Sequence, residues 1–480
     1  MFGLALLINT FFLVFRVLYV LFYPVDLSPE EAQYWDWSRH LDLSYYSKPP
    51  MVAYMNFLST HVFGNTELGV RINAILLSFL LSLITYFFAK KLFSEKVAFV
   101  ASVVPNLFTG FSINSVLFTT DSPLIFFWAL SVISFYFAIE KNTLSLWILT
   151  GVFSGLAFLS KYPAVFLLPL GILYLYLTKK ELLKDLKIFS SVLVAFLIAL
   201  PVLIWNAKHD FISFKHVSNL AQKHAHFPNF STFFEYLGGQ VLLLSVIPFF
   251  FVLYGWVRTF KERNKRLIFL TTFSLPVFLF FAFLSLKKRV YANWAGFGYY
   301  TASILFAYYF LKSPKSLKFL TLILSAFLTL LLHFTPLFDY LGLRNLLPPK
   351  RDPAKLLVGW EDLGKEVGRF YTGKELIFST AYQISAELAF YVPGNPRTYV
   401  FHVNRYTQYY LWREGLKNFK GKDAVFVSYG GVPKEVMRSF EGKEFLKEVR
   451  VVWRNQVVRK FYIYKLKNFK GEFYENPKGY

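Results

Sequence analysis

The chain has 480 residues, of which 55% are hydrophobic and only 17% are charged. One globular core cannot bury that much apolar side chain, so the composition excludes an ordinary soluble protein and indicates a lipid environment. The formal charge of +23 does not indicate nucleic acid, because most basic residues lie in short loops between apolar runs, and the absence of cysteine excludes disulfides and thiolate metal sites.

Eleven apolar runs, each about long enough to cross a bilayer as a helix, follow one another up to Pro336. The first is too long for a signal peptide and no small-residue cleavage site follows it, so we expect it to be retained. The predicted spans are residues 2–22, 69–89, 97–113, 122–139, 145–160, 163–178, 187–204, 237–257, 267–286, 290–311 and 316–336.

Basic residues concentrate in every second loop, which the positive-inside rule places in the cytoplasm. These loops carry Lys90, Lys91 and Lys96; Lys141; Lys179, Lys180, Lys184 and Lys187; Arg258, Lys261, Arg263, Lys265 and Arg266; and Lys312, Lys315 and Lys318. The N-terminus is then cytoplasmic, and the loops 23–68 and 205–236 and everything after about residue 337 lie outside. We expect a multi-pass protein of the cell inner membrane.

Beyond Pro336 the composition changes to that of a soluble domain, with β-rich apolar runs alternating with helical patterns. The strands are expected at residues 375–380, 397–402, 423–428, 449–453 and 460–465, and the helices at residues 361–371, 382–391 and 433–440. The predicted fold is a polytopic α-helical membrane protein of about 11 transmembrane helices, residues 1–336, with a soluble α/β domain, residues 337–480, on the outer (periplasmic) side.

The first outer loop contains adjacent carboxylates in Ser28-Pro29-Glu30-Glu31. One interpretation is a helix start, in which Ser28 and the acids face free backbone N–H groups. The other is a general base at the membrane surface, with the second acid orienting it or binding a cation.

A second acid, Asp121, precedes a long apolar run in another outer loop and has the same two interpretations. Basic residues on this side run against the positive-inside rule, which gives them a stronger claim to a function. They are Lys48, Arg71, Lys161, Lys287, Lys288 and Arg289. Acids and cations together suggest a site that binds a phosphate headgroup while a carboxylate activates an acceptor. Lys161 is equally consistent with snorkelling. For Lys287 to Arg289 the alternative is a loop anchor, and three positive charges on the outer side favour the phosphate role.

An ordered set of motifs resembles the polyprenyl-phosphate-sugar-dependent glycosyltransferases of the glycosyltransferase-C (GT-C) fold, which include protein O-mannosyltransferases and the lipid A aminoarabinose transferase. The set covers nearly the whole chain and is far more specific than any one member. Its parts are Glu30 to Trp35, Tyr46 to Pro50, Arg71, Thr120 to Pro123, Gly155 to Lys161, Trp205-Asn206 with His209-Asp210, Gly239-Gln240, Asn293-Trp294, and Tyr382-Gln383 to Phe390-Tyr391.

The resemblance implies a sugar donor linked through phosphate to a polyprenol, and a lipid, glycan or protein acceptor, with a lipopolysaccharide-like lipid weakly favoured. Glu30 stands where the family usually has a catalytic Asp, with Glu31 as the second acid and Asp121 as the acid of the second outer loop. Lys48 resembles the family lysine that contacts the lipid phosphate, and Arg71 matches an arginine at the start of the second span. Ser47 replaces a metal-ligating Glu of the aminoarabinose branch, so no cofactor is certain and a divalent metal stays open.

Substrate contacts are expected from aromatic and polar residues of the same motifs, although interfacial aromatics most often serve as membrane anchors. These residues are Tyr34, Tyr46, Trp205, Asn206, His209, Asn293 and Tyr382. The spacing of His209, His216, His224 and His226 fits no compact metal site. We expect a monomer. The alternative function is a lipid or lipid-linked-sugar flippase, which would place ionisable residues near mid-membrane.

Overall fold

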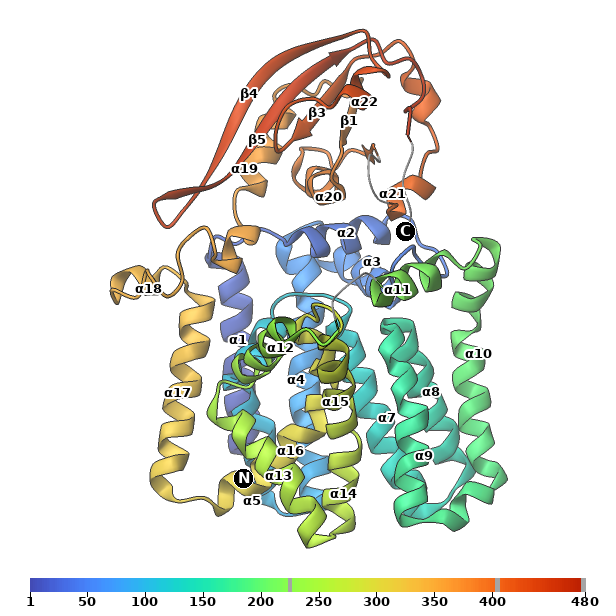
Figure 1. Cartoon of the computed structure of the whole chain (residues 1–480), viewed down its shortest axis with the longest axis vertical. Coiled ribbons are helices and arrows are strands. Elements are labelled where there is room, and N and C mark those ends of the chain that lie inside the picture. Colours follow the sequence, from blue (N-terminus) through green and yellow to red (C-terminus); the bar gives the residue numbers. More distant parts are fainter. Residues whose placement is uncertain (223–226, 402–405, 476–480) are drawn as a thin grey trace.

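The computed structural model describes residues 1–222, 227–401 and 406–475 and is mostly helical (Figure 1). In these ranges six helical segments are long and apolar enough to cross a membrane, or seven if a pair bent by 104° forms one span. The six are α1 (Phe2–Phe22), α4 (Glu67–Leu92), α7 (Asp121–Lys141), α10 (Leu186–Lys208), α14 (Lys265–Thr272) together with α15 (Leu275–Ser285), and α17 (Lys315–His333). The bent pair is α12 (Phe230–Leu243) and α13 (Ile247–Glu262).

Shorter elements complete the helical part. They are α5 (Glu95–Val103), η1 (Val104–Leu107), α6 (Thr109–Asn114), α8 (Leu144–Ser160), η2 (Tyr162–Phe166), α9 (Leu167–Thr178), η3 (Lys180–Lys184), η4 (Ala292–Gly298) and α16 (Tyr299–Lys312). The predicted spans 97–113 and 237–257 therefore differ from the structure, which breaks each of them. Pro105 lies in the break of the first span. In the second span, Ser245 and Val246 have positive φ angles, and a new helix with Pro248 in its first turn follows them.

The C-terminal part is built on a five-stranded mixed sheet of order β2-β1-β3-β5-β4. Its elements are η5 (Pro353–Leu357), α19 (Trp360–Gly368), β1 (Leu376–Ser379), α20 (Tyr382–Tyr391), β2 (Thr398–Val400), α21 (Gln408–Leu411), η6 (Leu416–Phe419), β3 (Ala424–Ser428), α22 (Lys434–Met437), β4 (Gly442–Trp453) and β5 (Gln456–Lys467). Strands β2, β1 and β3 run parallel, and β5 and β4 are antiparallel to their neighbours. Helices α19 and α20 pack on one face of the sheet through Trp360, Leu363 and Leu388.

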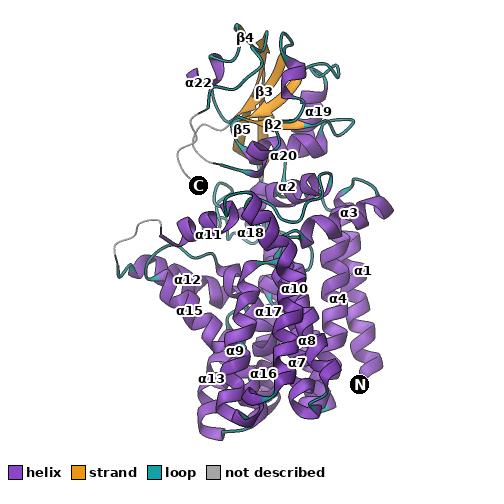
Figure 2. Ribbon diagram, turned by 90° about the vertical axis from the view of Figure 1, so that its right-hand side faces the viewer, coloured by secondary structure: helices purple, strands orange, loops and turns teal. Residues whose placement is uncertain are grey.

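Four short helices, α2 (Pro29–Ser38), α3 (Met51–Phe63), α11 (Ile212–Gln222) and α18 (Leu337–Tyr340), lie at the end of the helical part nearest the sheet (Figures 1 and 2). Helix α2 is enclosed between the membrane helices and α20, as both views show. The ring of Trp35 meets that of Phe390 at 4.8 Å, and the Leu27 N–H donates to the Tyr391 hydroxyl at 2.7 Å. The C-terminal part is therefore docked directly on the segment 23–68.

Two carboxyl groups are buried in this contact. The Asp26 carboxylate accepts the Trp360 N–H at 2.6 Å, and burial raises the pKa of Asp26 to about 6. Glu387 of α20 is 1% exposed, and neither of its oxygens has a hydrogen-bond partner among the described residues. Burial, followed by the negative charge of Asp26, raises the pKa of Glu387 well above its usual range, whereas Arg459 lowers it. Burial therefore favours the protonated form of Glu387.

A raised pKa stabilises the folded state below the unfolded pKa, and this contribution is lost as the pH rises through the folded pKa. We therefore expect Glu387→Gln to have little effect on the melting temperature of the detergent-solubilised protein at about pH 5 and to raise it relative to the wild type at about pH 9. The exposed Glu444→Gln is the matched control. Parallel melting curves of wild type and Glu387→Gln over this range would contradict the assignment.

Candidate active site

Helix α2 begins with a capping box that positions the adjacent acids. The Glu31 N–H donates to Ser28 Oγ at 3.3 Å, and the Ser28 N–H donates to Glu31 Oε2 at 2.9 Å. Both carboxylates thus lie in the first turn, where the helix dipole favours negative charge. The capping interpretation therefore holds for Glu31, and it leaves the Glu30 side chain free for another role.

Glu31 also anchors the loop to the membrane helices through an ion pair with Arg71, both side chains being fully buried. The guanidinium donates to Glu31 Oε1 at 3.0 Å and Oε2 at 3.1 Å, and to the carbonyls of Val25 and Asp26. The Phe118 N–H donates to Glu31 Oε1 at 2.9 Å. With the bond from Ser28, the carboxylate has four donors, which fills its acceptor capacity.

Glu30 differs from its neighbour. Its side chain is exposed, and among the described residues it has no hydrogen bond or ion pair. Burial, then the charge of Glu30, followed by Tyr382 and Asp121, raises the pKa of Tyr34 well above its ordinary value. Glu30 of α2 and Asp121 at the start of α7 thus act on the same hydroxyl through their charges, and Tyr382 at the start of α20 packs against the cluster that contains Tyr34.

Asp121 is held between a cation and an amide. Lys161 Nζ donates to Asp121 Oδ1 at 2.6 Å, and Asn293 Nδ2 donates to Oδ2 at 2.8 Å. Asp121 is 7% exposed and Lys161 is 9% exposed. Lys161 lies at the break between α8 and η2, so its ammonium is fixed at the end of a helix rather than carried on an exposed stem. Snorkelling therefore does not describe this residue.

An aromatic and polar cluster forms around Trp205. Trp205 Nε1 donates to Asp42 at 2.7 Å, and its ring stacks on His209 at 3.9 Å. Asn206 Oδ1 accepts the Ser213 N–H, which closes the turn into α11. Tyr46 packs in the same cluster as Trp205, and its N–H donates to Gln408 of α21 at 2.6 Å.

The two groups of residues are linked by Tyr162, the neighbour of Lys161 in the chain. Its ring lies 5.5 Å from that of Phe214 in α11, and Ser44, Asn206 and Ser213 surround its hydroxyl. Lys48 is half-buried in the turn that also holds Tyr46, and its carbonyl accepts the Tyr45 N–H. Loop 23–68 and the start of loop 205–236 therefore meet at Tyr162, the residue after Lys161. His224, His226 and His402 lie outside the described residues.

The three predicted cations Lys287, Lys288 and Arg289 each contact a different partner. Arg289 forms an exposed ion pair with Glu235, and Lys287 lies 5.1 Å from the centre of the Phe283 ring. The Lys288 ammonium lies 5.1 Å from the Trp294 ring, and burial lowers its pKa. Because Trp294 follows Asn293 in the chain, Lys288 is the member of this trio that the structure connects to Asp121.

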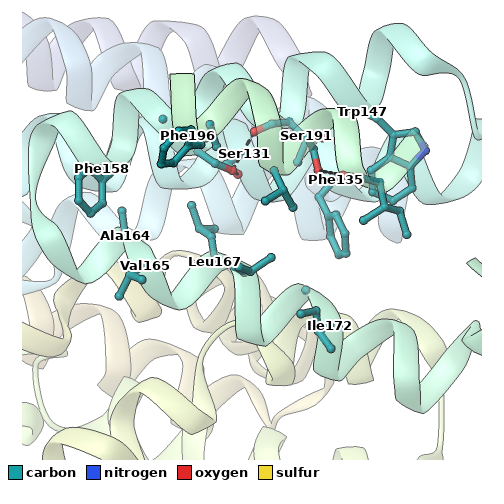
Figure 3. A pocket seen from close by; sticks show the side chains of 18 of the residues that line it. Ser131, Phe135, Trp147, Phe158, Ala164, Val165, Leu167, Ile172, Ser191 and Phe196 are labelled. Carbon is teal, nitrogen blue, oxygen red and sulfur yellow. Dashed lines mark hydrogen bonds between the residues drawn. The ribbon is translucent and has the colours of Figure 1, made fainter. Parts of the chain in front are cut away.

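A cavity of about 330 Å³ runs between α7, α8, α9 and α10 (Figure 3). Phe158, Ala164 and Val165 line it close to Lys161 in the chain, whereas Leu175, Leu183 and Ile188 line it near the opposite membrane face. The labelled side chains are almost all apolar (Figure 3). The cavity is thus an apolar space whose lining includes Phe158 and Ala164, each three residues from Lys161 in the chain, whereas Asp121 and Asn293 line a separate, smaller pocket.

The described residues contain no group of three or more His, Asp or Glu side chains arranged to hold a metal ion. Sequence reasoning missed Gln408 and Glu387, because each acquires its importance only from docking of the C-terminal part. The sequence signal that could have identified Glu387 is an acidic residue inside an apolar helical pattern.

Comparison with known proteins agrees with the geometry. Residues 47–205 match the family described as dolichyl-phosphate-mannose-protein mannosyltransferase. The lipid A galacturonosyltransferase RgtD of Rhizobium johnstonii is 30% identical over 80% of this chain and 81% of that protein. An undecaprenyl phosphate-α-4-amino-4-deoxy-L-arabinose arabinosyl transferase of Proteus mirabilis is 28% identical over 60% of this chain and 56% of that protein.

The fold agrees with the same assignment. The crystal structure of ArnT from Cupriavidus metallidurans bound to undecaprenyl phosphate superposes with a TM-score of 0.69 at 13% identity, over 96% of this chain and 98% of that one. The apo structure of that protein gives a TM-score of 0.67. The chain therefore belongs to the GT-C family of membrane glycosyltransferases and is a glycosyltransferase.

The Glu31–Arg71 pair generates a stability prediction. We expect Arg71→Gln to destabilise the protein by about 3–5 kcal/mol, because it leaves the Glu31 carboxylate buried without its counter-charge. Arg289→Gln, which breaks an exposed pair of the same kind, should cost about 1 kcal/mol or less. Thermal melts in detergent measure both variants. Equal shifts in melting temperature would show that the buried pair does not organise the site.

Proposed function

We propose that the protein transfers a sugar from a polyprenyl-phosphate donor to a hydroxyl or phosphate of a lipid acceptor resembling lipid A, at the outer face of the inner membrane. The names of the matched transferases support this donor and acceptor. The side of the membrane is supported by the loop charges: the N-terminus and the C-terminal part lie at opposite ends of the molecule (Figure 1), and the basic loops are on the side of the N-terminus.

The observation that carries the proposal is the apolar cavity next to Lys161. A polyprenol tail in this cavity would be sheltered between α7 and α10, and its phosphate would lie near the Lys161–Asp121 pair. A cation held in a buried site stabilises the negative charge that the phosphate gains as leaving group. Lys48 is the second cation that we assign to the phosphate, since its turn meets the loop beside Lys161.

Glu30 is the general base in this scheme. The acceptor oxygen attacks the anomeric carbon, the bond from that carbon to the phosphate oxygen breaks, and the phosphate leaves with the electron pair. The acceptor proton passes to Glu30, whose carboxylate is exposed and without a partner among the described residues. A single displacement of this kind inverts the anomeric configuration.

Glu31 and Arg71 take positioning roles in this proposal. Both are fully buried and mutually bonded, so neither can contact a phosphate or accept a proton without losing the bonds that hold α2. Asp121 fixes the ammonium of Lys161 and contributes charge beside Tyr34. Substrate contacts are assigned to Tyr382 and Asn293 at the rim of the site, and to Tyr46, Trp205 and His209 beside it.

A transfer assay tests the scheme. We expect Glu30→Gln to lower kcat by about 10²- to 10⁴-fold in transfer from polyprenyl-phosphate-linked galacturonate or 4-amino-4-deoxyarabinose to lipid A, because a general base contributes about that factor. Glu140→Gln, an exposed acid on the opposite membrane face, is the control and should retain wild-type turnover. Full activity of Glu30→Gln would remove the assignment.

Lys161 gives a separate prediction. We expect Lys161→Met to raise the KM for the donor and also to lower kcat, because the cation contacts the phosphate in the ground state and stabilises it more strongly in the transition state, where its negative charge grows. A flippase would instead move labelled donor across proteoliposome membranes without forming product. Donor movement that survives Glu30→Gln while no transfer occurs in the wild type would favour that alternative.

A further inference from the structure

A second groove, of about 450 Å³, lies between α13, α16 and α17, a set of helices that does not overlap with those around the first cavity. It is apolar along α13 and charged at the end of that helix. Its apolar lining is Ile247, Phe250, Phe251, Tyr254 and Leu317, and its charged lining is Arg258, Glu262 and Lys312. The mechanism proposed above uses none of these residues.

The apolar residues of α13 recur at the spacing of one helix face, from Ile247 to Tyr254, and Arg258 continues the same line. At 1.5 Å per residue, Ile247 and Arg258 are about 16 Å apart along the helix axis. This is about half of the roughly 30 Å hydrocarbon thickness of a bilayer, and so close to the depth of one leaflet. Phe250 and Tyr254 are more than half exposed along this face.

The charged end of the groove carries two cations, Arg258 and Lys312, and one acid, Glu262. Arg258 is held by Glu262 through bonds of 3.0 and 2.9 Å, and the Lys312 ammonium lies 3.8 Å from the centre of the Tyr308 ring. Among the described residues, no carboxylate is paired with Lys312. The segments at the charged end of the groove, residues 258–266 and 312–318, together contain eight basic residues and one acid, Glu262.

We propose that this groove binds one anionic glycerophospholipid from the leaflet opposite the C-terminal part. An acyl chain would lie along α13 from Tyr254 to Ile247, and the phosphate would contact Lys312 and Arg258. Basic pockets between transmembrane helices on the cytoplasmic side fit acidic headgroups, whereas a zwitterionic lipid would gain less from the surrounding positive charge. The groove opens to the lipid that already surrounds α13 and α17, so this occupant needs no further route of entry.

Native mass spectrometry of the full-length protein, delipidated and then exposed to phosphatidylglycerol or phosphatidylcholine, tests the proposal. The wild type should retain one phosphatidylglycerol at least about tenfold more than phosphatidylcholine, a difference of about 1.4 kcal/mol. The double variant Arg258→Gln, Lys312→Gln should lose this preference, whereas Lys265→Gln, which removes a cation of the same loop outside the groove, should keep it. Equal retention of both lipids by the wild type, or an unchanged preference in the double variant, would overturn the proposal.

Filling the groove provides a second test that leaves the charges in place. Leu317→Trp should reduce phosphatidylglycerol retention, because the indole occupies the space of the acyl chain. Inorganic phosphate should not raise the melting temperature of the delipidated wild type as the lipid does. Undiminished retention in Leu317→Trp, or equal stabilisation by inorganic phosphate, would show that the groove does not hold a lipid.

Discussion

The buried ion pair between Glu31 and Arg71 is the interaction on which the site depends. Removing two charges from water is expensive, and a buried pair persists only when nearly every donor and acceptor is used. Here the carboxylate takes donors from α2, α4 and the segment before α7. One residue therefore fixes three segments that are far apart in the chain, and the direction of Glu30 follows from the turn that Glu31 holds.

The same constraint explains why the C-terminal part takes part in the site. Once α2 is fixed on the membrane helices, its other side presents Trp35 and the Leu27 N–H to α20, and these contacts bring Tyr382 beside Tyr34. The pocket is thus closed by an element that comes about 350 residues later in the chain. Burial of Asp26 and Glu387 in this contact makes the docking sensitive to pH.

Much of this arrangement could be predicted from local pattern. Apolar run length predicted membrane helices, and Ser28 to Glu31 predicted a capped helix. The phosphate site inferred from acids and cations on one face stays a prediction. Local pattern could not assign different roles to Glu30 and Glu31, because the difference depends on Arg71 forming its ion pair with Glu31 and not with Glu30. It also missed the bend at Ser245 and Val246, since hydropathy continues through the break.

The central claim is that distant acids and cations meet in one pocket at the outer end of the apolar cavity. A structure of the protein with bound polyprenyl phosphate tests this most directly. The account predicts the phosphate within about 4 Å of Lys161 Nζ, the range of a salt bridge, with the tail between α7 and α10 and Glu30 facing the open side. A phosphate bound at Arg289 and away from Lys161, with that cavity empty of lipid, would contradict it.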